Sequence, residues 1–414
     1  MTNTEALLGI SLSDGRTFTP ATPNLSDNPI VLPVAGQSFA DIGMLVPTDV
    51  DSIDLRLLIG APFNYWGDDD GDGQGVNGIT ATGSLSLSIV DKDNQPVARN
   101  TTVDACKAPY KLTLSNTKGT LKTRYGVPNE SRFSESEVTY YINPKTTMLV
   151  VCFAKPSLAN IRDPGPANIW DIYDGFRVQS VTPSSYGLNF PTTGANNLYF
   201  DLTIAANDQV LYWEPVSHGG ITATMTSATK TSVRVTLTGP AVTDASQWNS
   251  DNPTRIDRPS LPQVFELVGR DSPGGQGNVI AKYGFVLKQW FVHRGSSYYN
   301  YSSSSSWCTK IGDYRVPMVK DLTNATCQGT FSGSHCQGAV GATPSSSNNR
   351  YQRRIGSGFF AEWGNMERYT GANFHTGRYW TSDTKDNGNH FIVYGDNGPV
   401  YDSSVGSGLC VYPY

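Results

Sequence analysis

The chain has 414 residues, a formal net charge of −5 and 38% hydrophobic residues. One hydrophobic core stops growing at about 250–300 residues, so this length predicts at least two domains. The 21 Tyr and 8 Trp residues exclude a disordered chain, and the negative charge leaves no broad basic face for nucleic acid or anionic lipid. No apolar run reaches the roughly 18 residues that a membrane span needs. We therefore expect a folded protein that neither binds nucleic acid nor inserts into a membrane.

Up to about residue 250, short runs of alternating apolar and polar residues are separated by Gly, Pro, Asn and Asp. This pattern is typical of antiparallel β-structure. Because almost no helical period lies between the runs, it favours β-sandwiches over a doubly wound parallel sheet. The predicted strands include residues 53–59, 83–90, 110–114, 148–153, 198–204 and 233–237.

The pattern changes near residue 258. A Gly-rich turn over 270–278 joins the runs 264–268 and 279–292, which predicts a long hairpin. Pro317 suits the first turn of a helix, and residues 359–366 carry a helical apolar stripe. We therefore predict a β-sandwich region over 1–258, which could comprise two sub-modules, and an α+β domain over 259–414. Strands are expected again at 379–381, 390–394, 400–401 and 409–412.

The six cysteines are even in number and scattered like the disulfide framework of an exported protein. Four of them lie in the last part and permit three connectivities, of which we predict the nested one; the alternative for some of the six is a buried free thiol. Because the first eight residues lack the basic segment of a signal peptide, we expect a fragment of a longer exported chain. The predicted pairs are Cys106–Cys152, Cys308–Cys410 and Cys327–Cys336.

An acidic stretch matches the beginning of a calcium loop. Asp68, Asp70 and Asp72 alternate and are followed by a glycine, so that their carboxylates can converge on one cation. Position twelve of the loop is not a glutamate and the flanks are not helical, which excludes an EF-hand. We predict a calcium-bound β-loop with help from a distant acid such as Asp91 or Asp93. The alternative is a plain acidic turn.

Residues 296–307 combine tyrosines with serines, as antibody loops do. Tyrosine supplies large, stiff contact area, and serine supplies adaptable hydrogen bonds. We predict that Tyr298, Tyr299, Tyr301 and Trp307 contact a receptor. The alternative is a Ser-rich connector whose tyrosines pack on a neighbouring sheet.

The sequence has none of the motifs that mark a serine hydrolase elbow, a zinc protease or a phosphate-binding loop. Its five histidines show no metal-ligand spacing. We therefore expect a binding protein and not an enzyme. The carboxylate pair of a glycoside hydrolase is a property of the fold and leaves no sequence signature, so a secreted glycosidase or carbohydrate-binding module stays the alternative.

Several longer phrases carry a family resemblance. The nested cysteines, the hairpin, the two helices and residues 378–382 (RYWTS) resemble a C-type-lectin-like domain. Upstream phrases resemble the adhesion region of invasin/intimin-type inverse autotransporters, specifically the invasin E kind. This resemblance implies a monomeric tip module on the outer-membrane surface of a Gram-negative bacterium, where it binds a host-cell receptor. The phrases are 64–73, 108–114, 139–144, 189–200 and 283–291.

The chain departs from sugar-binding C-type lectins, because it lacks their Glu-Pro-Asn or Gln-Pro-Asp and Trp-Asn-Asp tripeptides. The resemblance therefore implies a protein or glycoprotein partner and not calcium-dependent sugar binding. Invasin-like tips that engage integrins present an exposed aspartate to the metal ion of the receptor. Asp383, Asp386 and Asp396 lie in loops where such a group could stand.

Overall fold

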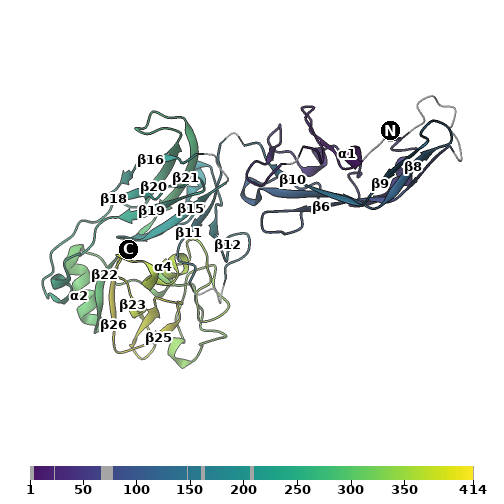
Figure 1. The fold of residues 1–414 in the computed structure, drawn as a ribbon. Helices are drawn as coiled ribbons and strands as arrows, with labels where there is room; N and C mark the ends of the chain where they lie inside the picture. The colour runs from purple at the N-terminus through teal and green to yellow at the C-terminus, as the bar shows by residue number, and fades with distance from the viewer. Residues whose placement is uncertain are drawn as a thin grey trace. The chain divides into compact units, whose positions relative to one another are not determined.

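The computed structural model describes residues 4–22, 24–66, 78–146, 148–159, 164–205 and 209–413. The chain divides into two compact units, Met1–Thr147 and Met148–Tyr414. Both are built mainly from antiparallel strands, which confirms the predicted fold class (Figure 1). The predicted domain boundary near residue 258 lies inside the second unit. None of the described helices is long and apolar enough to cross a membrane.

The first unit is organised around a five-stranded sheet. Its strand order is β3 (Ile30–Val31), β10 (Ser136–Asn143), β7 (Tyr110–Asn116), β6 (Ser84–Val90) and β4 (Ser52–Asp54). A second sheet joins β5 (Ile79–Thr82), β8 (Gly119–Thr123) and β9 (Glu130–Phe133). Every second residue of β7 is buried, as expected for a strand with one face on the core. Smaller elements are α1 (Thr4–Leu7), β1 (Ile10–Ser11), β2 (Thr17–Phe18), η1 (Phe39–Asp41), η2 (Leu55–Leu58) and η3 (Ala105–Lys107).

The second unit begins with a β-sandwich. One sheet is antiparallel throughout, in the order β12 (Trp170–Asp171), β13 (Gly175–Arg177), β11 (Val151–Lys155), β15 (Tyr199–Ile204), β19 (Ser232–Thr238), β18 (Ile221–Thr226) and β17 (Val216–His218). The other joins β16 (Tyr212–Trp213), β20 (Gln263–Arg270) and β21 (Val279–Leu287). Phe200 of the first sheet meets Phe285 of the second edge to face, with ring centroids 6.0 Å apart. Short 3-10 helices are η4 (Pro183–Leu188) and η5 (Ala245–Asn249).

The rest of the second unit is a six-stranded sheet with short helices. Its order is β14 (Thr193–Ala195), β22 (Gln289–Tyr299), β26 (Gly406–Tyr412), β23 (Arg378–Thr384), β24 (His390–Tyr394) and β25 (Val400–Asp402). The longest helix, α2 (Tyr301–Gly312), lies beside β22 and β26 (Figure 1). One continuous hydrophobic core runs through the sandwich and this part. The other helices are α3 (Val319–Leu322), η6 (Ser334–Cys336), α4 (Phe359–Trp363) and η7 (Met366–Arg368).

Three expected elements differ in the structure. Residues 53–59 form the end of β4 followed by the 3-10 helix η2. The strand expected over 279–292 is two strands, because β21 ends at Leu287 in the sandwich and β22 begins at Gln289 in the other sheet. Residues 296–307 form the end of β22 and the first half of α2. The second half of this stretch is therefore helix, neither binding loop nor connector.

Candidate binding surface

The six-stranded sheet fixes one exposed aromatic ring. Tyr298 is the second-last residue of β22 and pairs with Ser407 of β26. β26 carries Cys410, which forms a disulfide with Cys308 of α2. The strand that presents Tyr298 is therefore held by a neighbouring strand, which is bonded covalently to a helix.

The Tyr298 ring is 50% exposed and lies between two nitrogen-bearing side chains. The Arg378 guanidinium carbon is 5.4 Å from the ring centroid, and the His375 ring centroid is 6.2 Å away. Arg378 also donates from Nη1 to the Ser403 hydroxyl at 3.4 Å, and that hydroxyl donates to the carbonyl of exposed Val405. We call Tyr298, His375, Arg378, Ser403 and Val405 the Tyr298 surface.

His375 is held on both ring nitrogens. Its Nδ1 lies 3.1 Å from the Tyr379 hydroxyl, and its Nε2 lies 3.0 Å from the Ser407 hydroxyl. Burial lowers the pKa of His375 below its usual value. Burial therefore disfavours the charged form of the ring, and Arg378 supplies the fixed positive charge of the Tyr298 surface.

The other predicted aromatic residues pack inside the unit to different degrees. Tyr299 is partly buried, with its ring 3.8 Å from the Arg294 guanidinium, and its hydroxyl donates to Asn249 at 2.9 Å. Tyr301 stacks on the His390 ring with centroids 3.3 Å apart.

Among the predicted receptor-contacting aromatic residues, Trp307 differs most from the expectation. It is only 2% exposed, and its indole nitrogen donates to the Gln247 carbonyl at 3.0 Å. Trp307 shares a buried helical stripe with Ser304, Cys308 and Ile311. A ring buried in this way is a packing residue and offers almost no area to a receptor.

The three predicted aspartates are spread over separate turns. Asp383 accepts the backbone N–H of Val319 at 2.6 Å and is partly buried. Asp386 is exposed in the turn between β23 and β24. Asp396 is partly buried, and burial raises the pKa of its carboxyl above the ordinary value. Of the three, only Asp386 presents an exposed side chain.

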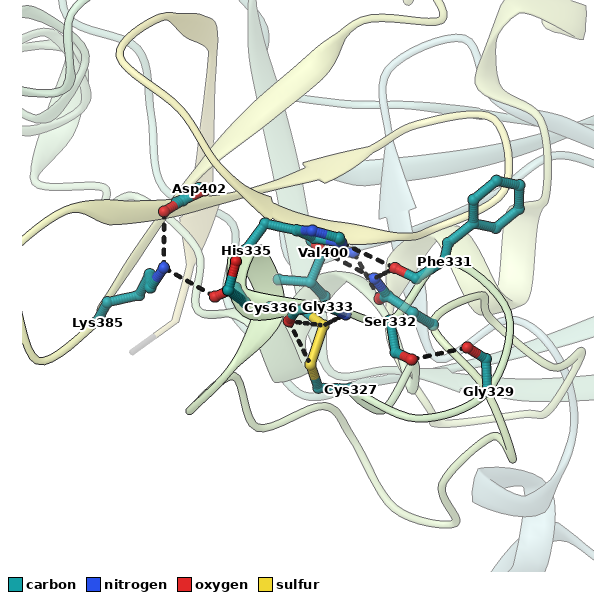
Figure 2. Close-up of a disulfide and its surroundings, with 12 residues drawn as sticks. Cys327, Gly329, Phe331, Ser332, Gly333, His335, Cys336, Lys385, Val400 and Asp402 are labelled. Atoms are coloured by element: carbon teal, nitrogen blue, oxygen red, sulfur yellow. Dashed lines mark hydrogen bonds and ion pairs between the residues drawn. A yellow bond between two sulfur atoms is a disulfide. The ribbon is translucent and has the colours of Figure 1, made fainter.

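The loop closed by the predicted bridge Cys327–Cys336 carries a further exposed aromatic residue, Phe331, which was not among the predicted contacts. The bridge Cys327–Cys336 closes the loop, and Phe331 lies at its tip with its ring 43% exposed. Figure 2 shows this ring pointing away from the disulfide. The Phe331 φ of 63° is a left-handed conformation that large residues rarely adopt. The sequence pattern that could have indicated this exposed ring is an aromatic residue among glycines and serines between two close cysteines.

Hydrogen bonds hold the backbone of this loop. The Phe331 carbonyl accepts from His335 Nε2 at 2.8 Å (Figure 2). It also accepts from Asn349 Nδ2 at 2.8 Å. The His335 ring stacks on Tyr401 of β25 with centroids 4.0 Å apart. The loop is thereby attached to the edge of the six-stranded sheet.

The predicted pairing is confirmed for the four cysteines after residue 300. Cys308–Cys410 and Cys327–Cys336 are both formed, each with a Cα–Cα distance of 5.4 Å. Cys106 and Cys152 are disulfide-bonded as well. Their predicted pairing with each other stays a prediction.

The predicted calcium ligands Asp68, Asp70 and Asp72 lie outside the described residues. Asp91, considered as a helper, is buried, and its Oδ1 accepts the backbone N–H groups of Asp93 and Gln95. Within the described ranges, no group of three His, Cys, Asp or Glu side chains is arranged to hold a metal ion.

Comparison with known proteins gives distant similarities. No protein-family model matches the chain. The crystal structure of invasin, a bacterial integrin-binding protein, is 13% identical with a TM-score of 0.37; the match covers 82% of this chain and 52% of that one. The C-terminal 282-residue fragment of intimin, solved with the intimin-binding domain of the translocated intimin receptor, is 12% identical with a TM-score of 0.34; the match covers 83% of this chain and 90% of that one. At these sequence identities and TM-scores, the similarity does not assign the binding activity of invasin or of intimin to this chain.

Proposed function

We propose that the second unit is the receptor-binding part of a bacterial surface adhesin and that the Tyr298 surface contacts a host-cell protein or glycoprotein. The observation that carries this proposal is the half-exposed ring of Tyr298, set beside Arg378 on a disulfide-tied sheet. Tyr and Arg are enriched among the residues that dominate binding energies at protein interfaces. Binding, and not catalysis, is the activity that such a surface supports.

Rigidity is what makes this surface suitable for a receptor. Ordering a mobile, rotamer-rich side chain at an interface costs about 0.5–1.5 kcal/mol. Tyr298 lies in a paired strand, and Arg378 donates to Ser403, so part of this ordering is complete before the partner arrives. The surface therefore loses less entropy on docking than a flexible loop would.

The finer assignments belong to the same proposal. We propose that the six-stranded sheet and its helices form a C-type-lectin-like domain at the tip of an invasin/intimin-type inverse autotransporter of the invasin E kind. The nested disulfides Cys308–Cys410 and Cys327–Cys336 support it, together with the sequence phrases that resemble this family. The chain would then act as a monomer on the outer-membrane surface.

Asp386 is the predicted aspartate best placed to reach a metal ion of a receptor, because its side chain is exposed. Asp383 is engaged by a backbone N–H, and Asp396 is partly buried. We therefore propose Asp386, in the turn beyond the far end of β23, as a contact additional to the Tyr298 surface.

The proposal is tested by binding of the labelled chain to host cells. We expect saturable binding that protease treatment of the cells abolishes. Treating the chain with EDTA, and removing the EDTA before the chain meets the cells, should leave this binding intact. The alternative, a secreted carbohydrate-binding module, predicts the reverse: cell binding that survives protease treatment and does not require Tyr298. Binding that protease treatment leaves unchanged would contradict a protein receptor.

A further inference from the structure

A polar pocket of about 290 Å³ lies beside α2, separate from the residues of the Tyr298 surface. We call it the α2 pocket. It is formed where β22, the first three turns of α2 and the segment after η5 come together. Its lining includes Arg294, Ser302, Ser303, Ser306, Lys310 and Asp251.

Arg294 brings a buried positive charge to the pocket, with the Tyr299 and Trp307 ring centroids 3.8 Å and 5.5 Å from its guanidinium carbon. The residue is 3% exposed, and its Nε donates to the Trp248 carbonyl at 2.7 Å. Its Nη1 donates to the carbonyl and the hydroxyl of Ser303, each at 2.9 Å. Within the described part of the chain, Nη2 makes no hydrogen bond and Arg294 forms no ion pair. Asp251 attracts this charge without forming a direct ion pair, so an anion that reached Nη2 would gain a charge-assisted hydrogen bond to a donor that the described residues leave unused.

The face of α2 that borders the pocket supplies hydroxyl groups and a second cation. Ser302, Ser306 and Lys310 are spaced four residues apart and therefore share one side of the helix. The hydroxyls of Ser302 and Ser306 have no hydrogen-bond partner among the described residues, and both side chains are exposed. The Lys310 ammonium is held at the pocket by a hydrogen bond to the Asp251 carbonyl.

The charges of the lining residues favour a ligand that carries one negative charge. Arg294 and Lys310 contribute two positive charges, and Asp251 contributes one negative charge to the lining. The sum favours a mono-anion over a phosphate dianion, which the Asp251 carboxylate would repel. Free serine hydroxyls and a carboxylate are also the groups that hydrogen-bond sugar hydroxyls.

From these contacts we propose that the α2 pocket binds the acidic residue of a saccharide, with its carboxylate on Arg294 Nη2 and its hydroxyls on Ser302, Ser306 and Asp251. The volume lies at the lower limit of ligand pockets, which is about 300 Å³, and so accommodates one sugar residue. The site goes beyond the Tyr298 surface and does not depend on it.

The test is calorimetric titration of the whole chain with sialyllactose and with methyl glucuronide, beside the neutral analogues lactose and methyl glucoside. We expect at least one acidic saccharide to bind about tenfold or more tightly than its neutral analogue, and binding to weaken as NaCl is raised. Equal affinity for acidic and neutral saccharides, or no binding of either acidic one, would overturn the proposal.

Matched variants locate the binding. Ser306→Glu places a carboxylate in the pocket and should lower the affinity at least about tenfold, whereas Thr309→Glu adds the same charge to exposed helix surface outside the lining and should leave it unchanged. Because both positions are exposed, both variants should fold. Tyr298→Ala should retain saccharide binding, which separates a failure of this site from a failure of the proposed receptor surface. Equal affinities of Ser306→Glu and the unmodified chain would contradict the assignment to this pocket.

Discussion

The buried carboxylate of Glu362 accepts two hydrogen bonds from Thr193, one from the backbone N–H at 3.0 Å and one from the hydroxyl at 2.6 Å. The backbone N–H and hydroxyl of Thr192 and the backbone N–H of Gly356 donate to the same carboxylate. Thr193 begins β14, which follows the sandwich strand β13 in the chain and pairs with β22 in the six-stranded sheet. One acid on α4 therefore fixes the edge strand of the sheet that presents Tyr298.

Replacing this acid should destabilise the second unit strongly. In Glu362→Gln, the amide nitrogen cannot accept the hydrogen bonds that one carboxylate oxygen accepts, so buried donors lose their partners. We expect the free energy of unfolding to fall by about 2–4 kcal/mol in urea denaturation. Glu214→Gln, at an exposed position of the same unit, is the control and should change it by less than about 0.5 kcal/mol. Equal stability of the two variants would show that the Glu362 contacts are not stabilising.

Acid should weaken the fold through His293. Burial, with a smaller effect from nearby His375, lowers the pKa of His293 to about 4. The unfolded chain then binds more protons than the folded one below the ordinary histidine pKa of about 6.5, so stability is complete above that pH and falls as the pH drops toward 4. Because His293 is only partly buried, we expect it to account for a loss on the order of 1–2 kcal/mol between pH 7.5 and 5.

Urea denaturation at the two pH values checks this expectation. His293→Gln should show a smaller loss of stability on acidification than the unmodified chain. His218→Gln, at an exposed position, should keep the original pH dependence. A His293→Gln variant with an unchanged pH dependence would assign the acid sensitivity to other groups.

The two bridges of the second unit should differ in their contribution to stability. Cys308–Cys410 closes 102 residues and Cys327–Cys336 closes 9. In the chain-entropy model, removing them by paired Cys→Ala substitutions costs about 4–5 and about 2–3 kcal/mol, respectively. Thermal unfolding of the two double variants measures the order. If removing the bridge of the short loop lowers stability more, native-state packing, and not chain entropy, determines how much each bridge stabilises the fold.

Non-reducing peptide mapping tests the remaining pair. We expect a linked peptide that contains Cys106 and Cys152, beside those of the two bridges in the second unit. A peptide that links Cys106 to any other cysteine would contradict the predicted pairing.

Local sequence patterns predicted most strands because burial on one face imposes a period of two. The run predicted at 83–90 is β6 (Ser84–Val90), and the run at 233–237 lies within β19 (Ser232–Thr238). Chain order alone could not predict that the sheet changes at Lys288, between β21 and β22. That change is a tertiary effect, because apolar runs stand on both sides of it, at 283–287 and at 290–292.

The candidate site was predicted only in part for a related reason. The serine run 302–306 has weak helix propensity, yet residues 304, 307, 308 and 311 are buried at helical spacing. Asn300 caps the helix by accepting the backbone N–H of Ser303. Packing of this stripe overrides the propensity, which buries Trp307 and leaves Tyr298 exposed at the strand end.

The most direct test of the proposed receptor surface is the affinity of Tyr298→Ala for host cells. Tyr212 of β16 is 48% exposed, close to the 50% of Tyr298, so Tyr212→Ala is a matched control on the sandwich. Truncating an aromatic anchor costs at least about 2 kcal/mol, so we expect about a thirtyfold loss of affinity for Tyr298→Ala, none for Tyr212→Ala, and unchanged melting temperatures for both. If Tyr298→Ala binds host cells as tightly as Tyr212→Ala does, the Tyr298 surface is not the receptor contact.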